Sequence, residues 1–175
     1  MTKVLMISGD ANLLKNGSAA RERLALQAGA VDQLDVFVWP SVHSAFSIWK
    51  AARQEHYDVI TAQDPFWRGL LAWKIARLTG ARLNLQLHAD LKGQSLAKHV
   101  LGHIMLRHAD CIRIVSERIK KEVEAVGVRA PVTVLPVFID PAPFMKVRRM
   151  PHPQKTILWI GRFEQEKTPL EAIAI

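Results

Sequence analysis

The chain has 175 residues, of which 49% are hydrophobic and 23% are charged, a balance that supports a packed core and excludes an intrinsically disordered protein. Its formal net charge of +8 favours an acidic partner, such as a phosphorylated substrate, an anionic membrane surface or a nucleic acid. The one cysteine, Cys111, lies in an apolar run, so we expect a small buried residue of a cytoplasmic protein and neither a disulfide nor a zinc cluster.

Short apolar runs alternate with helical patterns in the first part of the chain. The runs predict strands at residues 3–8, 33–38, 58–62, 82–87, 111–115 and 132–135. Helices are predicted between them at residues 19–27, 45–52, 67–78, 96–105 and 117–124. Strands that alternate with helices indicate right-handed βαβ units, and therefore an α/β fold with a doubly wound, Rossmann-like parallel sheet.

In an open parallel sheet, ligands bind beyond the carboxyl ends of the strands. Asp10, Asp64 and His88 each follow a predicted strand, so all three are candidates for a site at this edge. Two alternatives stay open. Either aspartate is equally suited to a turn or a helix cap, and His88 is also suited to a structural hydrogen bond at a strand end.

The composition changes from residue 141 onward, where prolines alternate with basic residues. This texture predicts an extended linker at 141–155. A strand and the start of a helix follow at 156–175, and they are too short to build a core of their own. We therefore expect a Rossmann-like domain at 1–140, the linker, and the opening of a second domain at 156–175. That opening would pair with another sheet edge, swap into a neighbouring chain or stay disordered, and we expect edge pairing or an intermolecular contact, which would give a homo-oligomer.

Residues 157–167 join the last predicted strand to its helix across a glycine turn. Arg162 and Lys167 lie at this corner, where free backbone N–H groups and the positive end of the helix favour an anion. An arginine fork with a lysine point charge suits a diphosphate. The alternative is an ordinary strand-to-helix corner with two solvated cations.

Gly161-Arg162 followed by Glu166-Lys167 resembles the nucleotide-sugar-binding motif of the family 4 (group 1) retaining glycosyltransferases, which have the two-domain GT-B fold. Further matching segments occur in the family's order. Gly17-Ser18 stands where the family has a glycine-rich turn, and residues 109–110, 115–117 and 134–140 match recurrent segments, with Val137-Phe138 in place of the family's Asn-Gly.

The resemblance implies the N-terminal, acceptor-side half of a GT-B enzyme that moves a sugar from a nucleotide-diphosphate-sugar to an acceptor hydroxyl, without a metal or another cofactor. It implies that His88 contacts the donor sugar and stabilises the transition state. Arg162, Lys167 and Gly17 would bind the donor diphosphate, and Asp10 and Asp64 the acceptor. The chain alone would be inactive or nearly so, because the donor site needs both domains.

Basic residues, among them Lys92, Lys98 and Arg107, flank the apolar stripe of the predicted helix 96–105. They form either a solvated basic face or a patch for anionic lipid head groups. The second reading suits an enzyme that glycosylates a lipid-linked or cell-envelope acceptor at the inner face of the membrane. His99 and His103 lie four residues apart on the same helix, but no third ligand is evident, so we expect no metal site.

Other classes of α/β protein fit the sequence less well. It contains neither the Gly-x-Gly-x-x-Gly of dinucleotide oxidoreductases nor a Walker motif, and we expect no nucleic-acid partner because no nucleic-acid-binding motif is present. The alternative that stays open is a non-catalytic Rossmann-like module that binds an acceptor or an anionic lipid.

Overall fold

The computed structural model describes residues 1–148, 160 and 170. The chain divides into two compact units, Met1–Phe138 and Ile139–Ile175. Arg162 and Lys167, and with them the predicted diphosphate corner, lie outside the described residues.

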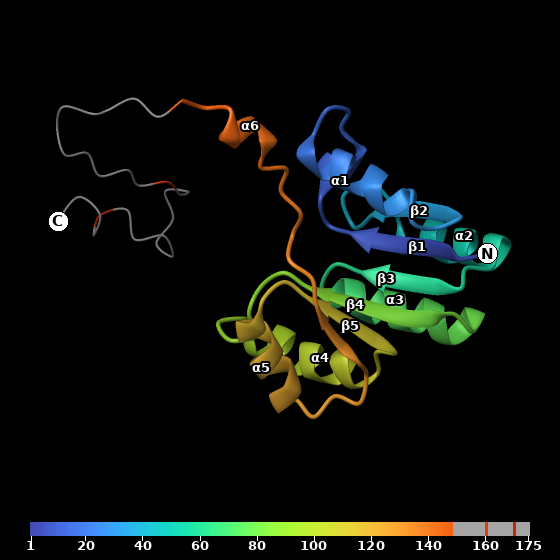
Figure 1. Cartoon of the computed structure of the whole chain (residues 1–175). Helices are drawn as coiled ribbons and strands as arrows, with labels where there is room; N and C mark the ends of the chain where they lie inside the picture. The colour runs from blue at the N-terminus through green and yellow to red at the C-terminus, as the bar shows by residue number, and fades with distance from the viewer. Residues whose placement is uncertain (149–159, 161–169, 171–175) are drawn as a thin grey trace. The chain divides into compact units, whose positions relative to one another are not determined.

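The first unit is built around six strands in the order β2-β1-β3-β4-β5-β6, and each strand is parallel to its neighbours (Figure 1). The strands are β1 (Lys3–Ser8), β2 (Gln33–Val38), β3 (Val59–Ala62), β4 (Arg82–Leu87), β5 (Cys111–Ile114) and β6 (Val132–Val134). The chain turns back after β2, so that β3 lies on the other side of β1. The Rossmann-like fold predicted from the alternating pattern is therefore confirmed.

Five helices connect these strands, preceded by one short 3-10 helix, η1 (Ala11–Leu14). They are α1 (Ala19–Ala28), α2 (Ala45–Glu55), α3 (Trp67–Thr79), α4 (Leu96–Arg107) and α5 (Glu117–Ala125). The local sequence explains their ends. The hydroxyl oxygen of Ser116 accepts the N–H of Ile119, as expected for the N-cap of α5. Gly80 ends α3 in the left-handed conformation, with φ of 78°.

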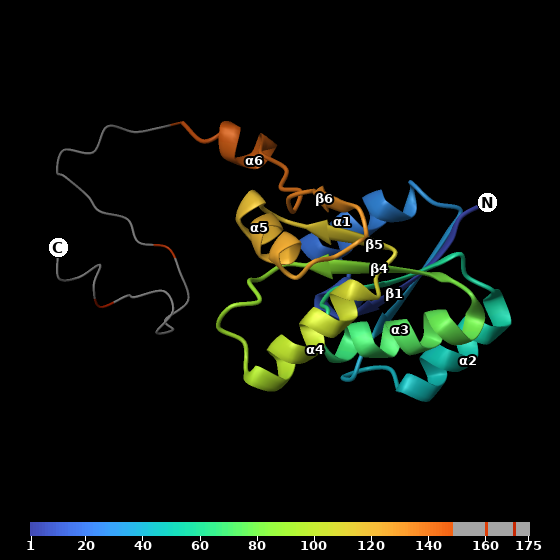
Figure 2. The same cartoon turned by 90° about the horizontal axis from the view of Figure 1, so that it is seen from below.

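The main hydrophobic core lies on one face of the sheet. Leu5, Ile60, Leu85 and Ile112 point to this face from β1, β3, β4 and β5, and residues of α2 to α5 pack on them. Figure 2 shows α2, α3 and α4 side by side below the sheet and α1 on the other side. Because side chains alternate along a strand, the intervening residues of β3, β4 and β5 point away from this core.

Most of these intervening residues are polar, and several bond to each other across the strands. Thr61, Asn84 and Cys111 form one cross-strand row. The Thr61 hydroxyl donates to Oδ1 of Asn84 at 2.7 Å, and Nδ2 of Asn84 donates to Sγ of Cys111 at 2.9 Å. In the next row, Nη1 of Arg113 donates to Oε1 of Gln86 at 3.0 Å. Cys111 was expected in an apolar setting. It is instead half-buried in this polar row.

The described part of the second unit contains one short helix, α6 (Ala142–Met145). Oδ1 of Asp140 accepts the N–H of Ala142 at 2.9 Å, and the fixed φ of Pro141 suits a first helical turn. The prediction of an extended chain from residue 141 is therefore wrong over these residues. In the part of the chain that the structure describes, no helix combines the length and apolar character that a membrane crossing requires.

Candidate functional site

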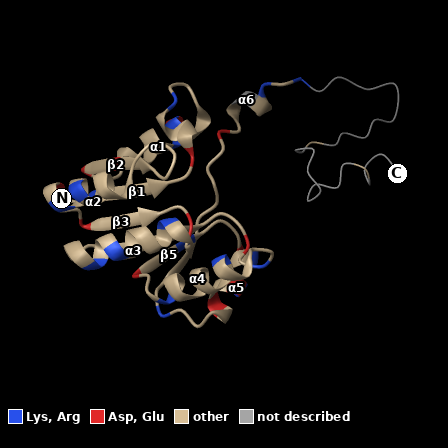
Figure 3. Cartoon of the chain, turned by 180° about the vertical axis from the view of Figure 1, so that it is seen from behind, with Lys and Arg blue, Asp and Glu red and all other residues tan. Residues whose placement is uncertain are grey.

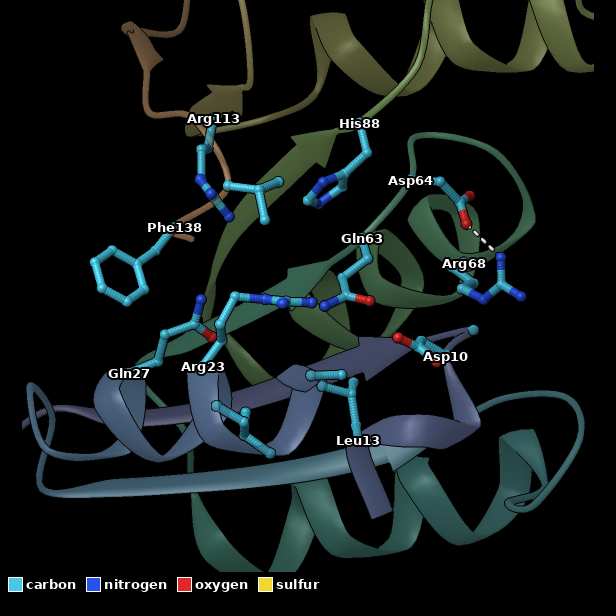
Figure 4. Close-up of a pocket in the computed structure, with 14 residues that line it drawn as sticks. Asp10, Leu13, Arg23, Gln27, Gln63, Asp64, Arg68, His88, Arg113 and Phe138 are labelled. Atoms are coloured by element: carbon cyan, nitrogen blue, oxygen red, sulfur yellow. Dashed lines mark hydrogen bonds and ion pairs between the residues drawn. The ribbon is translucent and has the colours of Figure 1, made fainter. Parts of the chain in front are cut away.

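A pocket of about 430 Å³ opens at the carboxyl edge of the sheet, within the first unit (Figure 4). Loops after β1, β3 and β4 form its floor, α1 forms one wall, and the segment after β6 forms the rim. It is lined by Gly9, Asp10, Leu13, Ala20, Arg23, Leu24, Gln27, Gln63, Asp64, Arg68, His88, Arg113, Val137 and Phe138. The pocket brings together three residues predicted from strand ends, namely Asp10, Asp64 and His88.

Asp64 is held in place by two groups of α3. Its Oδ1 accepts the N–H of Phe66 at 2.9 Å, which forms the turn into the helix, and its Oδ2 pairs with Nη1 of Arg68 at 2.5 Å. Nε of Arg68 donates to the carbonyl of Trp39 at 2.9 Å. Asp64 therefore serves both as a turn residue and as a carboxylate of the pocket, so the two readings of this residue do not exclude each other.

Asp10 precedes η1 and acts as its cap. Its Oδ1 accepts the backbone N–H and the side-chain N–H of Asn12, both at 2.9 Å. The backbone N–H of Asp10 donates to Oγ of Ser8, and this hydroxyl in turn donates to Oε1 of Gln63. These bonds connect the end of β1 to the residue after β3, and they fix the position of Gln63 in the pocket.

His88 follows β4 at the mouth of the pocket, where it keeps contact with solvent. The surrounding protein lowers the pKa of its imidazole below 6.5 by desolvation, and the charges of Arg113 and Arg23 lower this pKa further, against the opposite effect of Asp64. This lowering favours the neutral form of the imidazole. A neutral imidazole presents one nitrogen as a hydrogen-bond donor and the other as an acceptor, which suits contact with a hydroxyl.

Arg113 enters the pocket from the middle of β5. Its Nε and Nη2 donate to the carbonyl of Leu135 at 3.2 and 3.0 Å, and Nη2 also donates to that of Pro136 at 3.3 Å. Burial lowers the pKa of its guanidinium, which remains charged at neutral pH because an arginine is not deprotonated in proteins. Arg113 thus fastens the segment after β6 to the sheet.

The sequence did not predict Arg68, Arg113 or Gln63 as site residues, although signals existed for two of them. Arg68 lies four residues after Asp64, the spacing of a helical ion pair. Arg113 interrupts the apolar strand Cys111–Ile114, and such an interruption marks a strand with one polar face.

Gly17 does not line the pocket. It lies in the turn between η1 and α1, exposed and with φ of +73°, where a residue with a side chain would be strained. Its predicted contact with the donor diphosphate stays a prediction.

The three basic residues predicted to form a membrane patch have separate surroundings. Nζ of Lys98 lies 5.8 Å from the ring centroid of Phe66, whereas Nε of Arg107 donates to the carbonyl of Val126 at 3.0 Å. Lys92 is exposed beside a different hollow, between α4 and α5. Figure 3 shows Lys and Arg along several helices and not on α4 alone. A lipid-binding role for these residues stays a prediction.

His99 and His103 lie close together on α4, with 4.3 Å between their ring centroids. Nδ1 of His99 lies 3.3 Å from the carbonyl oxygen of Leu91. Within the described residues, no group of three His, Cys, Asp or Glu side chains is arranged to hold a metal ion.

Comparison with known proteins identifies both a family and a fold. A sequence model described as Glycosyltransferase Family 4 matches residues 18–143. Among solved structures, the chain is similar to that of a UDP-GlcNAc 2-epimerase from Methanocaldococcus jannaschii, with a TM-score of 0.56 and 11% identity. The match covers 77% of this chain and 45% of that chain, so the chain spans less than half the length of this structural relative. No curated protein matches in sequence.

Proposed function

The chain belongs to glycosyltransferase family 4, and from this premise we propose that residues 1–138 are the acceptor-side domain of an enzyme that transfers a sugar from a nucleotide-diphosphate-sugar to an acceptor hydroxyl. The observation that carries the proposal is the convergence of Asp10, Asp64 and His88 on one pocket at the carboxyl edge of the sheet. The sequence placed all three at strand ends, and the fold joins these ends in space.

In the proposed reaction, Asp64 orients the acceptor hydroxyl as a hydrogen-bond acceptor. The Arg68 ion pair keeps this carboxylate in a fixed direction, and a fixed acceptor lowers the entropic part of the barrier. His88 donates a hydrogen bond to the donor sugar from its neutral imidazole. His88 lies exposed directly after β4 and lines the pocket, and no hydrogen bond engages its ring nitrogens among the described residues, so both are available to a ligand.

The resemblance to retaining enzymes supplies the remaining features of the proposal. The departing diphosphate would help to deprotonate the acceptor hydroxyl on the same face of the sugar. Arg162 and Lys167 would stabilise the charge of that diphosphate, with Gly17 close to it and without a metal ion. Because the donor site of such enzymes needs groups from both domains, we expect the 175-residue chain to bind acceptor but to show little or no transfer. A lipid-linked or cell-envelope glycan at the inner face of the membrane is the proposed acceptor.

Ligand binding by the 175-residue chain tests this proposal. Saturation-transfer NMR with a panel of saccharides should show acceptor contacts that disappear in Asp64→Asn and persist in the control Asp140→Asn, whose carboxylate accepts the N–H of Ala142 outside the pocket. Calorimetry with nucleoside diphosphates and nucleotide sugars should show weak or no binding. Tight binding of a nucleotide sugar by this chain alone would contradict the assignment of most of the donor site to other residues.

The second candidate is a non-catalytic module that binds the acceptor only. It predicts the same saccharide contacts but no transfer when the chain is supplied together with a donor-binding domain. Detection of glycosylated acceptor by mass spectrometry in that mixture, and its loss in His88→Ala, would exclude the binding module.

A further inference from the structure

Positive and negative charges lie at different ends of the pocket. Figure 4 shows Asp10, Asp64 and Arg68 at one end and Arg113 at the other, with the side chain of Arg23 running from α1 into the middle. Three arginines and two aspartates line the pocket. The lining therefore carries more positive than negative charge. The contacts of each arginine show which of them supply the surplus.

The acidic end is balanced in part. Asp64 pairs with Arg68, so these two charges compensate each other. Oδ1 of Asp10 accepts two N–H groups of Asn12, which orient this carboxylate without neutralising it. Neither carboxylate forms an ion pair with Arg23 or Arg113 among the described residues, so these two cations have no direct counter-ion and one positive charge remains in excess.

The guanidinium of Arg113 is held by neutral groups. Its hydrogen-bond acceptors are the carbonyls of Leu135 and Pro136 and the side-chain amide of Gln86. Carbonyl oxygens fix the direction of a guanidinium but do not neutralise its charge. A partly buried cation without a counter-ion is unfavourable in the empty pocket and attracts an anion into it.

Arg23 reaches the same region from the opposite wall. Among the described residues, no hydrogen bond or ion pair engages its guanidinium, which leaves the five N–H groups of its fork available to a ligand. Arg23 and Arg113 both act on the imidazole of His88 through their charges. The two arginines and His88 therefore surround one volume, to which α1, β4 and β5 each contribute.

We propose that the acceptor bound in this pocket carries an anionic group, a phosphate or a carboxylate, which Arg23 and Arg113 contact while the acceptor's hydroxyls face Asp10 and Asp64. This inference rests on the proposed function and makes it more specific: the substrate class is an anionic sugar or polyol and not a neutral one. Arginine forks match the geometry of both anions.

Calorimetric titration of the 175-residue chain with four probes tests the inference. The probes are glucose 6-phosphate, glucuronate, glucose and inorganic phosphate. We expect both anionic sugars to bind at least about tenfold more tightly than glucose, which corresponds to about 1.4 kcal/mol. Inorganic phosphate alone should bind more weakly than the sugar phosphate, because it lacks the hydroxyls.

Two variants on the same helix make a matched pair. Arg23→Gln should weaken the binding of both anionic sugars about tenfold, within the range for charge-assisted hydrogen bonds, and leave the affinity for glucose unchanged. Arg21→Gln should leave all four affinities unchanged, since the guanidinium of Arg21 donates to the carbonyl of Leu13 and does not line the pocket. Arg113→Gln should repeat the loss, provided that circular dichroism shows an intact fold.

The results that would overturn this inference differ from those that would overturn the proposed function. Equal binding of glucose and of the anionic sugars, or equal losses in Arg21→Gln and Arg23→Gln, would overturn the inference and leave the acceptor site intact. The inference would also fail if a nucleoside diphosphate displaced the sugar phosphate in an Arg23-dependent manner, because the cationic end would then serve the donor. By contrast, saccharide contacts that do not depend on Asp64 would contradict the proposed acceptor site itself.

Discussion

The guanidinium of Arg68 occupies the space beside Gly9 in which any other residue would place its side chain. A Cβ atom at Gly9 would lie 2.1 Å from Nη2 and 2.3 Å from Cζ of Arg68, far closer than atoms in contact approach each other. The same guanidinium pairs with Asp64 and donates to the carbonyl of Trp39. Gly9, after β1, therefore leaves the space that Arg68 occupies in its ion pair with Asp64, after β3.

Gly9→Ala should expel Arg68 from this position and break its pair with Asp64. The pair is only partly exposed, with side-chain exposures of 28% and 18%, so we expect a loss of about 1–2 kcal/mol in the free energy of unfolding. Urea denaturation measures this loss. The affinity for saccharides should fall as well, because the carboxylate of Asp64 loses its fixed direction.

Gly29→Ala is the matched control for this substitution. A Cβ atom at Gly29 would have no neighbour closer than 3.7 Å, and the backbone there has an ordinary φ of −69°. Its effect should stay within about 0.5 kcal/mol. Equal stabilities of the two variants would show that Arg68 leaves its position at no cost.

The pKa of His88 should respond to the charge of Arg23. Because Arg23 and Arg113 lower this pKa, Arg23→Gln should raise it towards the ordinary value, whereas Arg21→Gln should leave it unchanged. An NMR titration of the imidazole resonances of both variants measures the shift. An unchanged His88 pKa in Arg23→Gln would place that guanidinium outside the pocket.

The same depressed pKa predicts how stability depends on pH. The folded-state pKa of His88 lies below the unfolded-state value, so the unfolded chain binds more protons between the two values. This contribution to stability is complete above about pH 6.5 and is lost as the pH falls through the folded-state pKa. His88→Gln should therefore flatten the stability profile between that pKa and pH 6.5. A profile that keeps its full slope would assign the effect to other groups.

The sequence predicted the strands well because their apolar side chains follow the period of a buried sheet. Predicted and observed strands differ by at most one residue at either end, as at residue 115, which follows β5. The helix α6 was missed because proline-rich segments have several conformations, and the bond between Asp140 and Ala142 that favours a turn is local and weak.

The pocket was less accessible to prediction, because its residues come from separate elements. His88, Asp10 and Asp64 could be found, since each lies within two residues of the end of an apolar run. Arg113 could not be placed from its own strand. Its position depends on the register of β5 against β4, which sets it opposite Gln86, and such a register is not encoded locally.

The polar rows on the open face of the sheet should contribute to stability and also position Arg113. Gln86 is only 7% exposed. Its Nε2 donates to Oγ1 of Thr61 at 2.9 Å, and its Oε1 accepts from Arg113 at 3.0 Å. Gln86→Leu fills nearly the same volume but removes both hydrogen bonds, so that Thr61 loses one of its two partners and Nη1 of Arg113 loses its acceptor. We expect a loss of about 1–3 kcal/mol in the free energy of unfolding.

Gln54→Leu on the exposed side of α2 is the control, because Gln54 has no side-chain hydrogen bond among the described residues and leucine suits a helix. Its effect should stay within about 0.5 kcal/mol. Gln86→Leu should also weaken the binding of anionic sugars, because Arg113 loses one of its fixed acceptors. A loss of affinity in proportion to the loss of stability is expected only if the Gln86–Arg113 bond accounts for both effects. Equal stability of Gln86→Leu and the unsubstituted chain would mean that an apolar residue fits this face as well, and that Arg113 is positioned by the carbonyls of Leu135 and Pro136 alone.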